Sequence, residues 1–169
     1  MSTDLKRRNV PFSPPDMTEA EANEVRDTIL SGWITTGPRT KKLEKLISEY
    51  VGTEKTVCLN SATAAMEMVL HVLGVGSGDE VIMPAYTYTA SASVVDHVGA
   101  TIKMVDIRKA GSSDEDQDFE MDYEKLAEAI TERTKVVVPV DLAGICANVD
   151  KIMEVITRPE ILAKFTPAN

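Results

Sequence analysis

The sequence predicts an α/β protein whose core is a largely parallel β-sheet with helices on both faces. Two patterns carry this prediction. Short apolar runs alternate along the chain with longer segments whose apolar residues recur at helical spacing. The distance from one apolar run to the next leaves room for one helix, which is typical of right-handed crossovers between parallel strands.

Two helices are expected before the first strand. Residues 18–30 carry apolar side chains at helical spacing, and the pattern ends at Gly32. Residues 40–50 show the same pattern, which stops at Gly52. The loop 31–38 joins the two helices.

Strands and helices alternate in the rest of the chain. The expected strands are 56–59, 81–84, 102–106 and 135–140, and the expected helices are 64–73, 87–98, 122–130 and 148–156. No clean closing element is expected after residue 156. Since a parallel sheet with so few strands leaves an unpaired apolar edge, we expect the chain to be the front part of a larger domain.

Composition excludes several classes of partner. The 169 residues suffice for one core, and the formal charge of −9 argues against nucleic acid as a ligand. There is no basic amphipathic stretch for a membrane surface and no apolar segment long enough to span a bilayer. The acidic run 114–118 is expected to be a solvated loop.

The cysteines and histidines indicate no disulfide and no metal site. The charged N-terminus has no apolar stretch behind it and does not resemble a signal peptide, so Cys58 and Cys146 predict reduced thiols in a cytoplasmic protein. Cys58 falls in the expected strand 56–59 and is predicted to be a buried core residue. His71 and His97 lack metal-ligand spacing.

The junction between residue 59 and the following helix is a candidate phosphate site. There Asn60, Ser61, Ala62 and Thr63 lead from an expected strand into a helix. The first N–H groups of a helix have no intrahelical partner and attract anions, and hydroxyl groups add hydrogen bonds. The alternative is that Ser61 or Asn60 only caps the helix.

A second candidate site follows the next expected strand. Tyr86 and Tyr88 come directly after residue 84, and ligands of open α/β sheets bind outside the carboxyl ends of the strands. The two rings could stack on a planar ligand. The alternative is that they pack between strand and helix.

Six segments follow one another in a recognisable order: 32–38, 60–66, 73–84, 86–88, 99–106 and 134–140. This arrangement resembles the DegT/DnrJ/EryC1/StrS family of sugar aminotransferases over about residues 30 to 150. The resemblance implies a three-layer α/β fold of the aspartate aminotransferase type (PLP fold type I), incomplete in this chain. Residues 1–38 would form an N-terminal helix and substrate-side loop, and residues 39–169 the N-terminal part of the cofactor-binding large domain.

The resemblance also implies roles for individual residues. Ser61, Ala62 and Thr63 would hold the phosphate of pyridoxal 5'-phosphate, and Tyr88 would stack on its pyridine ring. Trp33 and Thr35 would lie near the sugar substrate, often at a subunit boundary. The phosphate and ring roles agree with those inferred from the residues themselves.

The chain departs from the family in two respects. Asp141 stands where family members often have histidine, so the role of that imidazole is not carried over. The family's aspartate that pairs with the pyridine nitrogen, and its lysine that binds the cofactor covalently, would lie past Asn169. Neither Lys135 nor Lys151 sits in the right motif, and no catalytic residue is assigned in this chain.

The family resemblance implies that the parent protein is an enzyme of saccharide biosynthesis and a homodimer. It would transfer an amino group from an amino acid, glutamate, to a keto-sugar nucleotide, and this chain would be an inactive portion of it. Two alternatives remain. One is a pyridoxamine-phosphate-dependent sugar dehydratase, whose deciding residue lies outside the chain. The other is a non-catalytic domain that associates with a partner or with its own kind.

Overall fold

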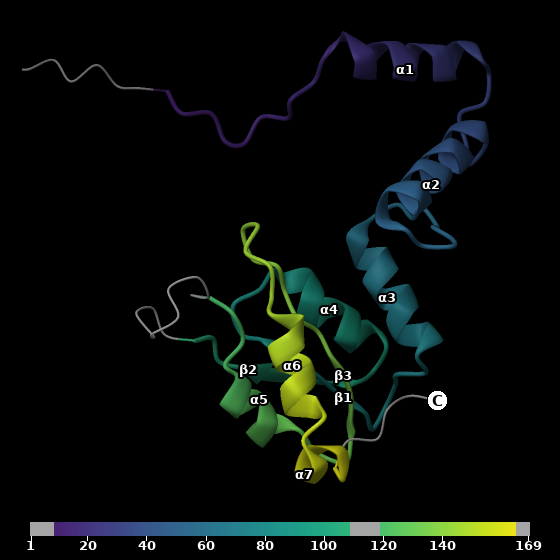
Figure 1. The fold of residues 1–169 in the computed structure, drawn as a ribbon. Coiled ribbons are helices and arrows are strands. Elements are labelled where there is room, and N and C mark those ends of the chain that lie inside the picture. Colours follow the sequence, from purple (N-terminus) through teal and green to yellow (C-terminus); the bar gives the residue numbers. More distant parts are fainter. Residues whose placement is uncertain (1–8, 109–118, 165–169) are drawn as a thin grey trace, which may run out of the picture. The chain divides into compact units, whose positions relative to one another are not determined.

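Three parallel strands form the sheet of the computed structural model, which describes residues 9–108 and 119–164 (Figure 1). The strands are β1 (Glu80–Pro84), β2 (Thr101–Val105) and β3 (Thr134–Val137), and they lie in the order β2-β1-β3. The central strand β1 pairs in parallel with both neighbours and is buried along its whole length. The predicted parallel sheet is therefore confirmed.

Helices cover both faces of this sheet, as the sequence predicts. One face carries α3 (Ala62–Val72) and α4 (Thr89–His97), and the other carries α5 (Tyr123–Ala129), α6 (Val149–Ile156) and α7 (Pro159–Leu162) (Figure 1).

Alternate residues of β1 point into two separate hydrophobic clusters. Val81 and Met83 pack with the residues of α3 and α4, whereas Ile82 packs with those of α5, α6 and α7. This alternation is the period-two pattern of a strand. None of the three side chains is measurably exposed, so β1 contributes fully buried side chains to both clusters.

The chain divides into two compact units after Cys58. The first unit contains α1 (Glu19–Leu30) and α2 (Pro38–Val51), and neither helix has a buried residue. Both helices lie where the sequence predicts them. The predicted functional division after residue 38 is a different boundary and stays a prediction.

The prediction of a strand at residues 56–59 is wrong. None of the described residues pairs with this segment, and a strand needs a hydrogen-bonded neighbour. Val57 is 71% exposed, and Cys58 is only partly buried, so the prediction that Cys58 is a buried core residue is also wrong. The backbone N–H of Cys58 donates instead to the Glu44 carboxylate of α2 at 3.0 Å.

The end of the described chain also differs from expectation. A short helix, α7, follows α6, and its Ile161 is buried in the cluster beneath α5 and α6. The acidic run 114–118 lies outside the described residues. In the described ranges, no helix has the length and apolar character needed to cross a membrane.

A buried carboxylate joins the amino ends of all three strands. Glu80, the first residue of β1, is 3% exposed. It accepts hydrogen bonds from Lys103 of β2 at 3.4 Å, from the Thr131 hydroxyl at 2.6 Å and from the Arg133 guanidinium at 2.5 Å. Since Thr131 and Arg133 precede β3, this one side chain fixes the spacing of the strands at that edge.

Burial alone would raise the pKa of Glu80. The hydrogen bonds from Thr131 and Arg133, with the positive charges of Lys103 and Arg133, outweigh burial and hold the pKa below its ordinary value. A carboxyl group whose pKa is lower in the folded chain adds stability above its unfolded pKa. That stability is lost as the pH falls through the folded pKa.

Glu80→Gln should therefore lower the free energy of unfolding at neutral pH by about 1–3 kcal/mol, because it removes a charge that three donors surround. The difference from the wild type should shrink as the pH falls through the lowered pKa of Glu80. Urea unfolding at neutral and acid pH measures both effects. Glu132→Gln, at an exposed carboxylate of the same turn, is the control and should change stability little. If Glu80→Gln unfolds with the same free energy as the wild type, or if the difference is the same at every pH, Glu80 does not have this stabilising role.

Candidate functional site

The carboxyl edge of the sheet receives the first turns of two helices. α4 follows the end of β1 directly, and α3 packs beside α4 and runs in the same direction (Figure 1). Because the loop 73–79 leads from the end of α3 to the amino end of β1, the start of α3 must lie toward the opposite edge. Both helix N-termini thus point their partial positive charges at the region where ligands of open α/β sheets bind.

The start of α3 has the features of a phosphate cradle. The Ser61 side chain caps the helix and accepts from the N–H of Ala64 at 3.1 Å. Within the described part of the chain, no protein acceptor bonds to the N–H groups of Ala62 and Thr63 or to the Thr63 hydroxyl. The Ser61 hydroxyl can cap the helix and still donate its own proton. Capping and phosphate binding are therefore compatible at this turn.

The two tyrosines after β1 have different surroundings. The Tyr86 ring lies against the ring of Phe119, a turn residue, with ring centroids 5.7 Å apart. Tyr88 is the N-cap residue of α4 and makes no side-chain capping bond. Tyr88 is 80% exposed, and its ring contacts no other ring of the described residues. Tyr88 is therefore the one of the two whose ring faces are free for a ligand.

Sequence reasoning missed Phe119. This residue follows the acidic run and belongs to no periodic pattern or motif. Nothing in the sequence indicated that the chain would bring it back to the end of β1.

The predicted substrate-side residues lie in the first unit. The indole Nε1 of Trp33 donates to the Thr36 carbonyl at 3.1 Å, and the ring covers Gly37 at the start of α2. A Cβ atom at Gly37 would lie 2.0 Å from that nitrogen, so this position has room only for glycine while the ring stays in place. Thr35 is exposed. The substrate contacts of Trp33 and Thr35 stay a prediction.

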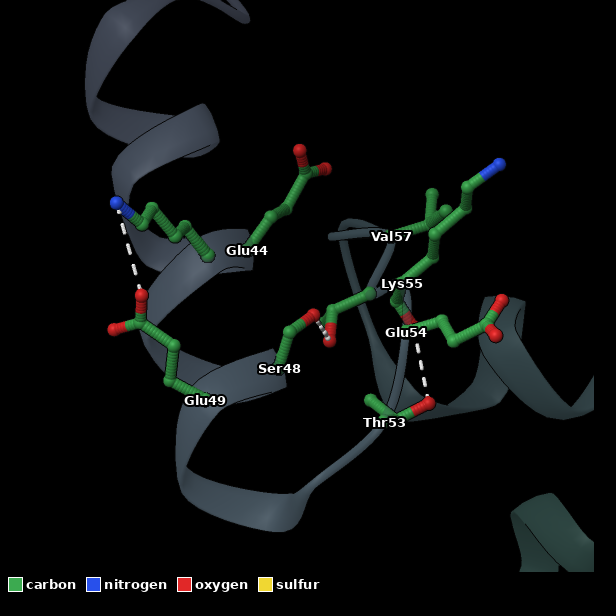
Figure 2. Close-up of a pocket in the computed structure, with 9 residues that line it drawn as sticks. Glu44, Ser48, Glu49, Thr53, Glu54, Lys55 and Val57 are labelled. Atoms are coloured by element: carbon green, nitrogen blue, oxygen red, sulfur yellow. Dashed lines mark hydrogen bonds and ion pairs between the residues drawn. The ribbon is translucent and has the colours of Figure 1, made fainter.

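A hollow of about 490 Å³ in the first unit lies between α2 and the segment 53–57 (Figure 2). Its lining carries three glutamates and two lysines, so its charge disfavours a phosphate. The hydroxyl groups of Ser48 and Thr56 bond to each other at 2.8 Å, and Lys45 pairs with Glu49 at 3.6 Å. These groups are engaged with the protein, and the hollow does not match the predicted site.

A second hollow, of about 310 Å³, lies between α3, α4 and β3. Apolar side chains such as Met66, Val94 and Val138 line most of it. Its Ser91 hydroxyl bonds to that of Thr87 at 2.8 Å, and an otherwise apolar lining does not suit a charged phosphate.

Other polar residues that the sequence singled out have structural partners. Asp141 accepts from the N–H of Ala147 at 2.8 Å and closes the turn after β3. His97 bonds through Nδ1 to Glu67 at 2.8 Å, which joins α4 to α3 at the surface. No group of three or more His, Cys, Asp or Glu side chains suited to a metal ion occurs within residues 9–108 and 119–164.

The sequence profile of the DegT/DnrJ/EryC1/StrS aminotransferase family matches residues 15–163 of this chain. The UDP-4-amino-4-deoxy-L-arabinose–oxoglutarate aminotransferase of Shewanella sediminis is 39% identical over 90% of the chain and 37% of its own length. The spore coat polysaccharide biosynthesis protein SpsC of Bacillus subtilis is 37% identical over 89% of the chain and 38% of its own length. The chain thus spans less than two fifths of the length of these relatives.

Solved structures give the same result. The PLP form of Spr1654 from Streptococcus pneumoniae has a TM-score of 0.85 and 59% identity over 96% of this chain and 39% of its own. NtdA of Bacillus subtilis with bound PMP has a TM-score of 0.78 and 31% identity over 95% of this chain and 37% of its own. The predicted resemblance and the predicted fold class, part of a PLP fold type I domain, are confirmed.

Gly37→Ala should displace the Trp33 ring, because the added methyl group would occupy the place of the indole nitrogen. The bond to Thr36 is then lost and the ring becomes more exposed to water. Since the chain has one tryptophan, a red shift of its fluorescence emission reports this directly. Gly76→Ala, where the nearest atom would be 3.8 Å from the new Cβ, is the control and should leave the emission unchanged. Equal emission from Gly37→Ala and the wild type would contradict the packing.

Proposed function

Because the chain belongs to the DegT/DnrJ/EryC1/StrS aminotransferase family, we propose that it forms the phosphate side of the cofactor site in a pyridoxal-phosphate-dependent sugar aminotransferase. The enzyme would transfer an amino group from glutamate to a keto-sugar nucleotide. One observation carries the proposal. The unbonded N–H groups at the start of α3 and the exposed Tyr88 ring at the start of α4 belong to two adjacent helices that begin at the same edge of the sheet.

The names of the relatives support the substrate class. One is an aminotransferase of a UDP-linked amino sugar with oxoglutarate, and another acts in polysaccharide biosynthesis. Oxoglutarate is the product that glutamate leaves when it gives up its amino group. This supports glutamate as the donor and a sugar nucleotide as the acceptor.

The residues of this chain would hold and orient the cofactor. When bound, pyridoxal phosphate supplies the electron sink for amino transfer. The N–H groups of Ala62 and Thr63, with the hydroxyls of Ser61 and Thr63, would donate to the phosphate, whose negative charge the helix dipole of α3 stabilises. The Tyr88 ring would cover one face of the pyridine ring and exclude water from it.

We extend the proposal to four further properties expected from the sequence. Trp33 and Thr35 would contact the sugar substrate. The enzyme would work in the cytoplasm as a homodimer. The 169 residues alone would bind the cofactor without transferring an amino group, because no lysine of the described chain lies in the family's covalent-binding motif.

Amino transfer is tested with the whole protein to which this segment belongs. Glutamate and keto-sugar nucleotides are supplied as substrates. We expect oxoglutarate and the amino sugar to form in equal amounts. A dehydrated sugar without oxoglutarate would replace the proposal with the dehydratase alternative. Cofactor binding without any turnover of sugar nucleotides would favour a non-catalytic domain.

Thr63→Val should weaken the binding of pyridoxamine phosphate by about 10- to 100-fold, because it removes one hydrogen bond to a charged acceptor. Pyridoxamine phosphate is the suitable probe since it needs no covalent bond to a lysine. Isothermal titration measures the affinity, and Thr63→Ser, which keeps the hydroxyl group, should bind nearly as well as the wild type. If Thr63→Val binds as tightly as the wild type, Thr63 does not hold the phosphate.

A further inference from the structure

We propose that Phe119 is a positioning residue for the cofactor site, which fixes the turn 84–88 and through it the ring of Tyr88. The inference rests on the proposed role of Tyr88 as the support of the pyridine ring. Phe119 belongs to no motif of the sequence analysis, and it follows β2 in the chain.

The contact between Phe119 and Tyr86 is a ring pair at the carboxyl edge of the sheet. The ring centroids are 5.7 Å apart and the ring planes are inclined by 49°. Aromatic pairs are attractive in tilted arrangements at separations of about 4.5–7 Å. Phe119 is 45% and Tyr86 53% exposed, so the pair lies at the rim of the edge and is not part of either hydrophobic cluster.

The backbone at Phe119 is strained. Its φ angle is +80°, in a region that bulky side chains disfavour and that glycine or asparagine adopts more readily. Such a conformation persists only where the neighbouring structure enforces it. A phenylalanine in this position therefore indicates that its ring has a use that offsets the strain.

The three residues after Phe119 enforce this conformation. Glu120 is 5% exposed, and its carboxylate accepts from the Asn148 N–H at 2.7 Å and from the Tyr123 hydroxyl. Met121 is buried and bridges to the strand-like segment after β2, and Asp122 caps α5. The segment 120–122 is thus bonded to α5 and α6. These contacts hold the backbone next to Phe119 in place, and the ring of Phe119 lies against Tyr86.

Contacts at three consecutive residues, Ala85, Tyr86 and Thr87, hold the turn that leads to Tyr88. The Ala85 N–H donates to the Val105 carbonyl at 2.7 Å, the Tyr86 ring packs on Phe119, and the Thr87 hydroxyl bonds to that of Ser91 at 2.8 Å. The Tyr88 ring contacts no other ring of the described chain. Its position thus depends on the turn, and the turn depends in part on Phe119.

Fluorine NMR of the chain labelled with 3-fluorotyrosine tests this dependence without any ligand. The chain has four tyrosines, and Tyr86→Phe and Tyr88→Phe assign their two signals. Phe119→Asn removes the ring while relieving the backbone strain, so the variant should fold and should shift the signals of both Tyr86 and Tyr88. Tyr50, in the first unit, is the reference that should not move. Phe119→Tyr keeps a ring and should leave both signals near their wild-type positions.

Tyr86→Ala removes the same contact from the other side and should shift the Tyr88 signal even if Phe119→Asn does not fold. A shift confined to Tyr86 in Phe119→Asn, or an unmoved Tyr88 signal in Tyr86→Ala, overturns the proposal.

Ligand affinities connect this result to the site. Phe119→Asn should bind pyridoxamine phosphate about 2- to 10-fold more weakly, the range expected for one aromatic pair, and inorganic phosphate as tightly as the wild type. Equal affinity for pyridoxamine phosphate in variant and wild type overturns the role of Phe119 in the site. If the wild type itself fails to bind pyridoxamine phosphate, the proposed function fails, and the NMR signals alone decide whether Phe119 positions Tyr88.

Discussion

The parallel direction of the three strands is the constraint on which the rest of the structure depends. Because β1, β2 and β3 all end at one edge, each connection must return across a face of the sheet, and the helix that follows β1 must begin at that edge. The same constraint directs α3, whose end leads to the amino end of β1. Two helix N-termini therefore point at one region, which gives that region donors and positive potential before any side chain contributes.

Two buried carboxylates stabilise opposite edges of this arrangement. Glu80 binds the amino ends of the strands together, away from the candidate site. Glu120 links α5 to α6 near the carboxyl edge through Tyr123 and Asn148. Burial and the bond to Glu120 raise the pKa of Tyr123, so its hydroxyl remains a protonated donor. The first carboxylate supports the fold, and the second supports the segment that carries Phe119.

Sequence reasoning predicted the alternating strands and helices, the parallel sheet and the start of the helix that Ser61 caps, because each depends on local periodicity or on capping residues. It failed at residues 56–59, where an apolar run has the composition of a strand but finds no described neighbour to pair with. It also missed Phe119. The contact of that ring with Tyr86 joins segments separated by a whole strand, and only the folded chain brings them together.

The most direct test of the account is an NMR titration of the chain with pyridoxamine phosphate, in which every backbone amide reports its own surroundings. If the start of α3 holds the cofactor, the largest shifts should occur at Ala62 and Thr63, with a smaller set at Tyr88, since those groups would contact the phosphate and the ring. Shifts concentrated in the hollow between α2 and residues 53–57, or none at concentrations that saturate a specific site, would contradict the claim that the start of α3 is the cofactor cradle.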